Sequence, residues 1–267
     1  MSGTRIEVAG ASAYVGTGSG KPEPDAPCVA FVHGAGMDHT VWALPARHFA
    51  RKGLRVLAPD LPGHGRSTGP ARSTIPAMAD WLADVFDAAG VEQAAVVGHS
   101  MGSLVAWQFA QGHADRCRAL ALLGTSMPMP VTDMLLNAAK DNHHAAFDMA
   151  NAWSHSPGGS LGANDNPGVW MLGAGERLLE RSGPGVFHAD LAACNAFNAD
   201  EADGAVTCPA LVIAGDEDRM TPARAGLDVA SHLAGAKVVR LAGCGHAMLS
   251  ERPNEILDAL IDVVTER

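Results

Sequence analysis

Short, predominantly apolar stretches alternate along the chain with longer segments in which apolar and polar residues mix. Six of these stretches are rich in Val, Leu, Ile and Ala and are apolar at consecutive positions: residues 28–32, 55–59, 94–98, 118–124, 210–215 and 237–243. Strands that are buried on both faces of a parallel sheet have this pattern. The chain is therefore predicted to be an α/β protein with a mostly parallel central sheet.

The mixed segments predict helices between the strands. Apolar residues from Ile75 to Ala89 recur every three or four positions, Ser73 or Thr74 offers an N-cap, and Gly90 ends the pattern. A similar stripe over residues 256–264 predicts a C-terminal helix that packs on the sheet, and residues 1–20 predict two short antiparallel edge strands with a turn at Gly10. We expect these two strands to join the sheet and helices to cover both of its faces.

The alternation of strands and helices is lost over residues 125–205, where Met, Asn, Ala and Gly dominate. Four helices are predicted there, over residues 131–141, 144–153, 175–181 and 185–197. We interpret residues 125–205 as an inserted helical cap (lid) subdomain on a core domain that comprises residues 1–124 and 206–267.

Composition narrows the class of partner. The 267 residues are 47% hydrophobic, which is ample for a core, and the formal net charge of −10 disfavours binding to nucleic acid or to anionic membranes. Five widely spaced cysteines without a CxxC motif indicate reduced thiols rather than disulfides or zinc. No apolar run approaches a membrane span or a secretion signal, so we expect a cytoplasmic protein that acts on a small neutral molecule.

Candidate chemistry begins at Ser100, in the sequence GHSMG between a predicted strand and a helical pattern. In a G-x-S-x-G turn the serine lies on a sharp bend, and the flanking glycines allow strand and helix to approach closely. A serine hydroxyl becomes a useful nucleophile only beside a base that a carboxylate orients. The stretch DEDRMTP after the fifth predicted stretch and CGH after the sixth supply Asp216 or Asp218 and His246, in the order Ser, Asp, His.

These residues resemble the α/β-hydrolase fold family over nearly the whole chain. HGAG at residues 33–36 is similar to its oxyanion loop, DLPGHGRS at 60–67 to the loop after its fourth strand, GHSMG to its nucleophile elbow, GDEDRMTP to its acid turn and GCGH to its histidine loop. The resemblance implies an eight-stranded α/β-hydrolase sheet and a catalytic triad of Ser100, Asp218 and His246. It favours Asp218 over Asp216 because the family's acid comes three residues after the glycine.

The resemblance also implies an oxyanion hole and the absence of a cofactor. The donors would be the backbone N–H groups of Met101 and Ala35, with Gly36 as a possible substitute for Ala35. The candidate pocket combines residues of the elbow, the oxyanion loop, the acid and histidine loops and the Met- and Trp-rich insertion: Gly34, Gly36, His99, Met127, Met149, Trp153, Trp170, Met220 and Ala247. Such an adaptable apolar pocket suits an uncharged substrate.

Other conspicuous residues have structural interpretations. We expect His33 and His64 to hold their own turns by hydrogen bonds, His99 to pack behind the elbow, and Cys244 to be a small packing residue. His143 and His144 lack further ligands at metal-like spacing, so no metal site is predicted.

The sequence thus predicts a serine hydrolase that cleaves a carboxylic ester of a small to medium, largely apolar, uncharged substrate through an acyl-enzyme. The serine at the elbow argues against dehalogenase and epoxide hydrolase chemistry, which needs an aspartate there. Lactone, thioester, amide or C–C hydrolysis, perhydrolysis and acyl transfer use the same triad and stay open. So does a receptor-like protein that binds a ligand with slow turnover.

Overall fold

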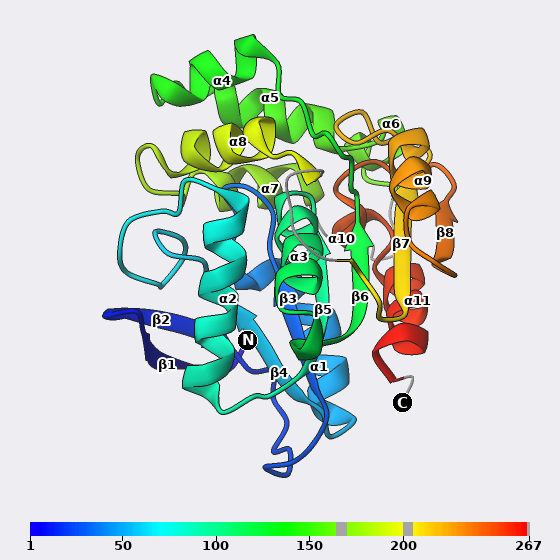
Figure 1. The fold of residues 1–267 in the computed structure, drawn as a ribbon. Coiled ribbons are helices and arrows are strands. Elements are labelled where there is room, and N and C mark those ends of the chain that lie inside the picture. The colour runs from blue at the N-terminus through cyan, green and yellow to red at the C-terminus, as the bar shows by residue number, and fades with distance from the viewer. Residues whose placement is uncertain (164–169, 200–204, 266–267) are drawn as a thin grey trace.

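The computed structural model describes residues 1–163, 170–199 and 205–265. Its centre is one eight-stranded sheet in the order β1-β2-β4-β3-β5-β6-β7-β8 (Figure 1). Six neighbouring strands are parallel, and two form an antiparallel edge. In chain order the strands are β1 (Gly3–Val8), β2 (Ala11–Gly16), β3 (Cys28–Val32), β4 (Arg55–Pro59), β5 (Ala94–His99), β6 (Cys117–Leu123), β7 (Ala210–Gly215) and β8 (Lys237–Leu241).

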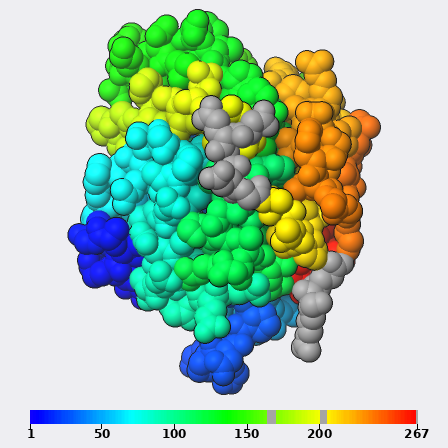
Figure 2. All heavy atoms as spheres, in the orientation of Figure 1, coloured from blue at the N-terminus to red at the C-terminus, as the bar shows by residue number. Residues whose placement is uncertain are grey.

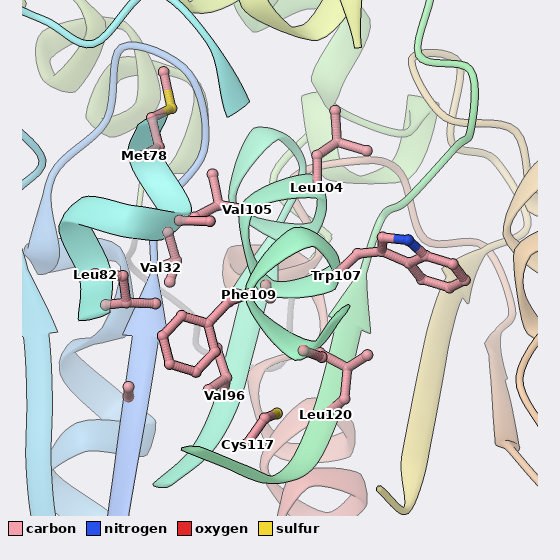
Figure 3. Close-up of a cluster of buried hydrophobic side chains, with 14 of the residues drawn as sticks. Val32, Met78, Leu82, Val96, Leu104, Val105, Trp107, Phe109, Cys117 and Leu120 are labelled. Atoms are coloured by element: carbon pink, nitrogen blue, oxygen red, sulfur yellow. The ribbon is translucent and has the colours of Figure 1, made fainter. Parts of the chain in front are cut away.

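Helices cover both faces of this sheet. One face carries α2 (Ile75–Ala89), α3 (Met101–Gly112) and α9 (Ala223–Ser231), and the other carries α1 (Ala43–Arg51) and α11 (Pro253–Thr265). Figure 3 shows the first face, where side chains of α2 and α3 pack on strand residues such as Val32, Val96 and Leu120. Shorter elements are η1 (His39–Trp42), η2 (Ala114–Arg116) and α10 (Met248–Glu251).

Because helices cover both faces of the sheet, its central strands are apolar at consecutive positions. In β3, Ala30 and Val32 face the layer of α2 and α3, whereas Val29 and Phe31 face the layer of α1 and α11. Because successive side chains of a strand point to opposite faces, both sets of positions must be apolar. The prediction of a mostly parallel eight-stranded sheet with helices on both faces is confirmed.

Helix α2 shows how local signals set the ends of an element. The Thr74 hydroxyl accepts the N–H of Ala77, which caps the first turn. Gly90 ends the helix in the left-handed region with φ of 61°, a conformation that glycine adopts without strain. Both ends agree with the predicted ones.

Among the described residues between β6 and β7, which are nevertheless neighbours in the sheet, there are five α-helices: α4 (Asp133–Lys140), α5 (Ala145–Ser154), α6 (Pro157–Ser160), α7 (Met171–Leu179) and α8 (Val186–Ala196). We call them the helical insertion. It lies across the carboxyl ends of the parallel strands (Figure 1) and forms the upper part of the molecule in Figure 2. No helix was predicted at α6, and the helix predicted over residues 175–181 begins four residues later than α7 does. Residues 164–169 and 200–204 of the expected cap lie outside the described residues.

The helical insertion has an apolar cluster of its own, built from α4, α5, α7 and α8. None of the described helices combines the length and the apolar character that crossing a membrane requires.

Candidate active site

Ser100 lies at the junction of β5 and α3, at the carboxyl end of the sheet. Its φ is 55°, a left-handed value that is unusual for a residue other than glycine and that marks a sharp turn. A Cβ at Gly98 would collide with the carbonyl group of Gly102, and a Cβ at Gly102 would collide with the carbonyl oxygen of Val32. The two glycines are therefore required for strand and helix to approach each other behind the serine.

Asp218 and His246 meet beside this turn, from the loops after β7 and β8. Oδ2 of Asp218 lies 2.8 Å from Nδ1 of His246, and both side chains are almost completely buried. Oδ1 of Asp218 accepts the N–H groups of Met220 at 2.9 Å and Thr221 at 2.8 Å, and the Thr221 hydroxyl donates to Oδ2 at 2.8 Å. The carboxylate is thus held in one orientation towards the imidazole.

Electrostatics keep Asp218 ionised. Burial opposes its charge, but His246 and the hydrogen bonds from His246 and Thr221 together outweigh burial and lower the pKa of Asp218 below its usual value. Asp216, the alternative acid in the same turn, points elsewhere and pairs with Arg240 at 2.7 Å. Of these two aspartates, Asp218 is the one that contacts the imidazole.

Ser100 and His246 line one cavity, but no hydrogen bond joins the Ser100 hydroxyl to Nε2 of His246. Among the described residues, Nε2 of His246 has no hydrogen-bond partner, although it is buried. Catalytic hydrogen bonds are often long in a free enzyme and tighten only when substrate binds. The structure therefore brings the acid and the histidine into contact and places the serine in the same cavity.

The loop after β3 lies against the elbow. A Cβ at Gly34 would lie 3.3 Å from Cβ of Ser100, so the backbone of this loop faces the reaction centre. Met101 is the first residue of α3, and its N–H is one of the first-turn groups that a helix leaves without an intrahelical partner. Gly36 is unsuitable as a substitute donor, because its N–H already donates to Oδ2 of Asp190 at 2.8 Å.

His99 faces the cavity rather than only packing behind the elbow. Its Nε2–H donates to the backbone oxygen of His246 at 2.9 Å, and the two rings lie 4.9 Å apart. Burial, and then the neighbouring His246, lower the pKa of His99 to about 3. His99 is therefore a neutral support for the loop that carries His246.

The cavity at Ser100 has a volume of about 140 Å³ and is mostly apolar. Of the candidate pocket residues, Gly34, His99, Trp153 and Met220 line it, as does Ala35. Residues from four helices of the insertion also line this cavity and were not among the predicted pocket residues: Leu135, Ala150, Leu179, Phe187, Leu191 and Cys194. A second cavity of about 410 Å³ adjoins it and shares Met37, His99, Ser154 and Leu179 with it.

Five candidate pocket residues do not line the cavity at Ser100. Gly36 packs beneath Phe187, Met127 packs on the sheet layer under α3, and Met149 packs in the cluster of the insertion. Trp170 is 76% exposed, and Ala247 lines the second cavity. The structure does not bring these five residues to the cavity at Ser100, and composition alone does not say which face of a helix meets the cavity.

Three further residues hold the site together. Thr221 fixes Asp218, as described above, and belongs to the acid turn that the sequence singled out. Glu251 is buried and accepts the N–H of Gly245, beside His246, and the N–H of Ser156 in the insertion. Asp190, on α8, binds the loop after β3. The sequence signal for Asp190 was an acidic residue between the apolar Ala189 and Leu191, whereas Glu251, between Ser250 and Arg252, gave no such signal.

Two side-chain clusters among the described residues have metal-like geometry. In the exposed one, His144 approaches Glu176 and Glu180, but Arg177 pairs with both carboxylates at 2.7 Å. In the buried one, formed by Asp38, His39 and Asp60, the acids accept hydrogen bonds from nearby backbone and side-chain groups. Both clusters are accounted for by protein partners.

Comparison with known proteins shows which family the chain resembles. A family model described as the alpha/beta hydrolase fold matches residues 27–166. The pimeloyl-(acyl-carrier protein) methyl ester esterase of Aromatoleum aromaticum is 30% identical over 253 residues, which cover 89% of this chain and 98% of that protein. A 2-hydroxymuconate semialdehyde hydrolase from a Pseudomonas species is 30% identical, covering 80% of this chain and 78% of its own.

Solved structures show the same fold. The enol-lactonase from Burkholderia xenovorans superposes with a TM-score of 0.87 at 24% identity, covering 98% of this chain and all (100%) of that one.

Proposed function

The chain belongs to the α/β hydrolase fold family and is a hydrolase of that fold, and from this premise we propose that it cleaves a carboxylic ester through an acyl-enzyme on Ser100. The observation that carries the proposal is the buried Asp218–His246 pair, with an N–O distance of 2.8 Å, beside a serine at a left-handed turn in the same apolar cavity. Nucleophile, base and orienting carboxylate are the three parts that serine hydrolysis requires.

In the proposed reaction, Oγ of Ser100 attacks the ester carbonyl carbon while Nε2 of His246 takes the hydroxyl proton. The carbonyl oxygen becomes an oxyanion and accepts hydrogen bonds from the N–H groups of Met101 and Ala35. His246 then protonates the departing alcohol, which leaves an acyl group on Ser100. A water molecule, deprotonated by His246, releases the carboxylic acid and restores the serine.

Asp218 orients the imidazole throughout this cycle. It accepts the Nδ1–H of His246, which leaves Nε2 free to take a proton, and its negative charge stabilises the imidazolium that forms. His99 supports the same loop through the backbone oxygen of His246.

The cavity supports a largely apolar, uncharged substrate. Aliphatic and aromatic side chains from α4, α5 and α8 form much of its wall, and the one Arg or Lys among its described lining residues, Arg219, is exposed. We propose that the helical insertion acts as a cap, since these helices close the side of the cavity that faces away from the sheet. The curated relatives named above include an ester hydrolase, which favours the same bond type.

The test is labelling with a serine-directed fluorophosphonate, followed by hydrolysis of p-nitrophenyl esters of increasing acyl length. We expect the wild type to label and to turn over. Ser100→Ala and His246→Ala should lose at least about 10³-fold in kcat, because nucleophile and base act as a unit.

Substantial hydrolysis by either variant would contradict the mechanism. A wild-type protein that binds the esters but does not hydrolyse them, with binding unchanged in Ser100→Ala, would instead indicate a receptor-like role. If lactones or thioesters are hydrolysed at a higher kcat/KM than esters, the proposed substrate class changes accordingly. The proposed triad is unaffected by that result.

A further inference from the structure

The oxyanion loop is connected to the helical insertion through one buried carboxylate. Oδ2 of Asp190, on α8, accepts the backbone N–H of Gly36 at 2.8 Å. The same oxygen lies 2.7 Å from Nε2 of His64, in the loop after β4. Asp190 is completely buried, so three segments that are distant in the sequence converge on one side chain in the interior.

Burying a carboxylate is unfavourable unless its charge is compensated. Both ring nitrogens of His64 face oxygen acceptors, Asp190 on one side and the carbonyl of Pro62 at 3.1 Å on the other. Only the imidazolium form donates to both. Burial alone would lower the pKa of His64, but the Asp190 carboxylate outweighs it and raises the pKa.

This compensation matters because of where the carboxylate lies. Gly36 follows Ala35, the proposed oxyanion donor, and an uncompensated negative charge so near would oppose a developing oxyanion. The His64 imidazolium makes the pair neutral as a whole. Asp190 can therefore hold the loop without an electrostatic penalty at the reaction centre.

Packing reinforces the same contact. A Cβ at Gly36 would lie 2.8 Å from a ring carbon of Phe187, one turn before Asp190 on α8, so the loop rests directly on this helix. Phe187, Leu191 and Cys194 of α8 also line the cavity at Ser100. One helix thus contacts both the space for substrate and the loop that carries Ala35.

We propose that Asp190 is a positioning residue that fixes the oxyanion loop through the N–H of Gly36, so that the N–H of Ala35 is directed at the reacting carbonyl oxygen. This role rests on the proposed ester hydrolysis at Ser100. In this role α8 positions the oxyanion loop through Asp190 and also lines the cavity.

The test compares Asp190→Ala with Asp190→Asn in hydrolysis of the preferred p-nitrophenyl ester. Loss of one oxyanion donor lowers kcat by about 10²–10³-fold, so a misdirected donor in Asp190→Ala should lower kcat by about 10- to 100-fold with KM within about threefold. The amide oxygen in Asp190→Asn still accepts the Gly36 N–H and should keep kcat within about threefold of wild type. The rate of fluorophosphonate labelling should follow kcat.

A purely structural role would give a different result. It would lower the melting temperature and the fraction of protein that labels, and it would change KM because α8 lines the cavity, but kcat per labelled site would stay the same. Asp80→Ala is the matched control for Asp190→Ala, since it breaks another Asp–His pair, with His113 at 3.0 Å on the surface, and should change none of these quantities.

If Asp190→Ala does not fold, the double variant Asp190→Leu with His64→Leu replaces the buried pair by apolar side chains, which proteins often tolerate. It still removes the acceptor of the Gly36 N–H and should show the same fall in kcat. The proposal is overturned if kcat per labelled site in the alanine or double variant stays within threefold of wild type, or if Asp190→Asn falls as far as Asp190→Ala. A wild type that neither labels nor hydrolyses esters contradicts the proposed function itself.

Discussion

Two aspartates two positions apart have different surroundings in the acid turn. Asp218 is buried against His246 and receives hydrogen bonds from Met220 and Thr221, whereas Asp216 is partly exposed and pairs with Arg240. The residues alone left both as candidate acids, and the resemblance to the family favoured Asp218. The geometry supports the same choice, because a carboxylate orients an imidazole only from hydrogen-bond distance.

The difference between the two aspartates is directly testable. Asp218→Asn should lower kcat by about 10³–10⁴-fold, because the amide no longer holds the productive tautomer of His246. Asp216→Asn removes only a surface ion pair and should leave kcat within about twofold. Steady-state hydrolysis of one p-nitrophenyl ester by both variants measures this, and the reverse ranking would assign the acid to Asp216.

At the scale of elements, the helices of the insertion decide the shape of the cavity. Trp153 on α5 lines the cavity at Ser100, whereas Trp170, immediately before α7, is 76% exposed. Both were candidate pocket residues in the sequence, where nothing distinguished the two indoles. Which tryptophan meets the cavity depends on how α5 and α7 are rotated when they pack.

This pair provides a matched test of the cavity wall. Trp153→Ala should shift the optimum of kcat/KM towards longer acyl chains, since two more buried methylene groups contribute about 0.8 kcal/mol each and change the ratio by about tenfold. Trp170→Ala should leave the acyl-length profile unchanged. The p-nitrophenyl ester series measures both profiles, and an identical shift in both variants would show that Trp153 does not limit the site.

At the scale of the whole molecule, the His64–Asp190 pair joins the helical insertion to the core. Burial would lower the pKa of His64, but Asp190, with smaller contributions from the Pro62 carbonyl and Asp60, raises it in the folded protein above the unfolded value of about 6.5. A raised folded pKa means that the folded state binds the proton more tightly. Its contribution to stability is therefore complete below about pH 6.5 and is lost as the pH rises through the folded pKa.

The free energy of unfolding should reflect this linkage. The stability difference between wild type and His64→Gln should be larger at pH 6 than at pH 9, by an amount on the order of 1 kcal/mol, as expected for a hydrogen bond to a charged group. Urea denaturation at the two pH values measures it, and comparing the variants cancels groups that titrate alike in both. A difference that is equal at the two pH values, or larger at pH 9, would show that His64 is not held protonated in the folded state.

The sequence by itself determined the sheet and the candidate catalytic residues, because both depend on local patterns. Strands buried on two faces must be apolar at consecutive positions, so β3, β4 and β7 were predicted with the bounds that the structure has. The elbow needs glycines two positions before and two positions after Ser100, because a Cβ at either would collide with neighbouring backbone. Strand ends likewise indicated where Asp218 and His246 lie.

Only the tertiary structure decided what surrounds them. Gly36 and Asp190 are 154 positions apart and belong to segments with no shared pattern, yet they form one hydrogen bond. The cavity wall depends on which side of α4, α5 and α8 faces Ser100, and their composition does not specify that rotation. Features that depend on neighbouring residues in the chain, such as strands and the elbow, can therefore be predicted from the sequence. Contacts between distant elements form only when the insertion packs on the core.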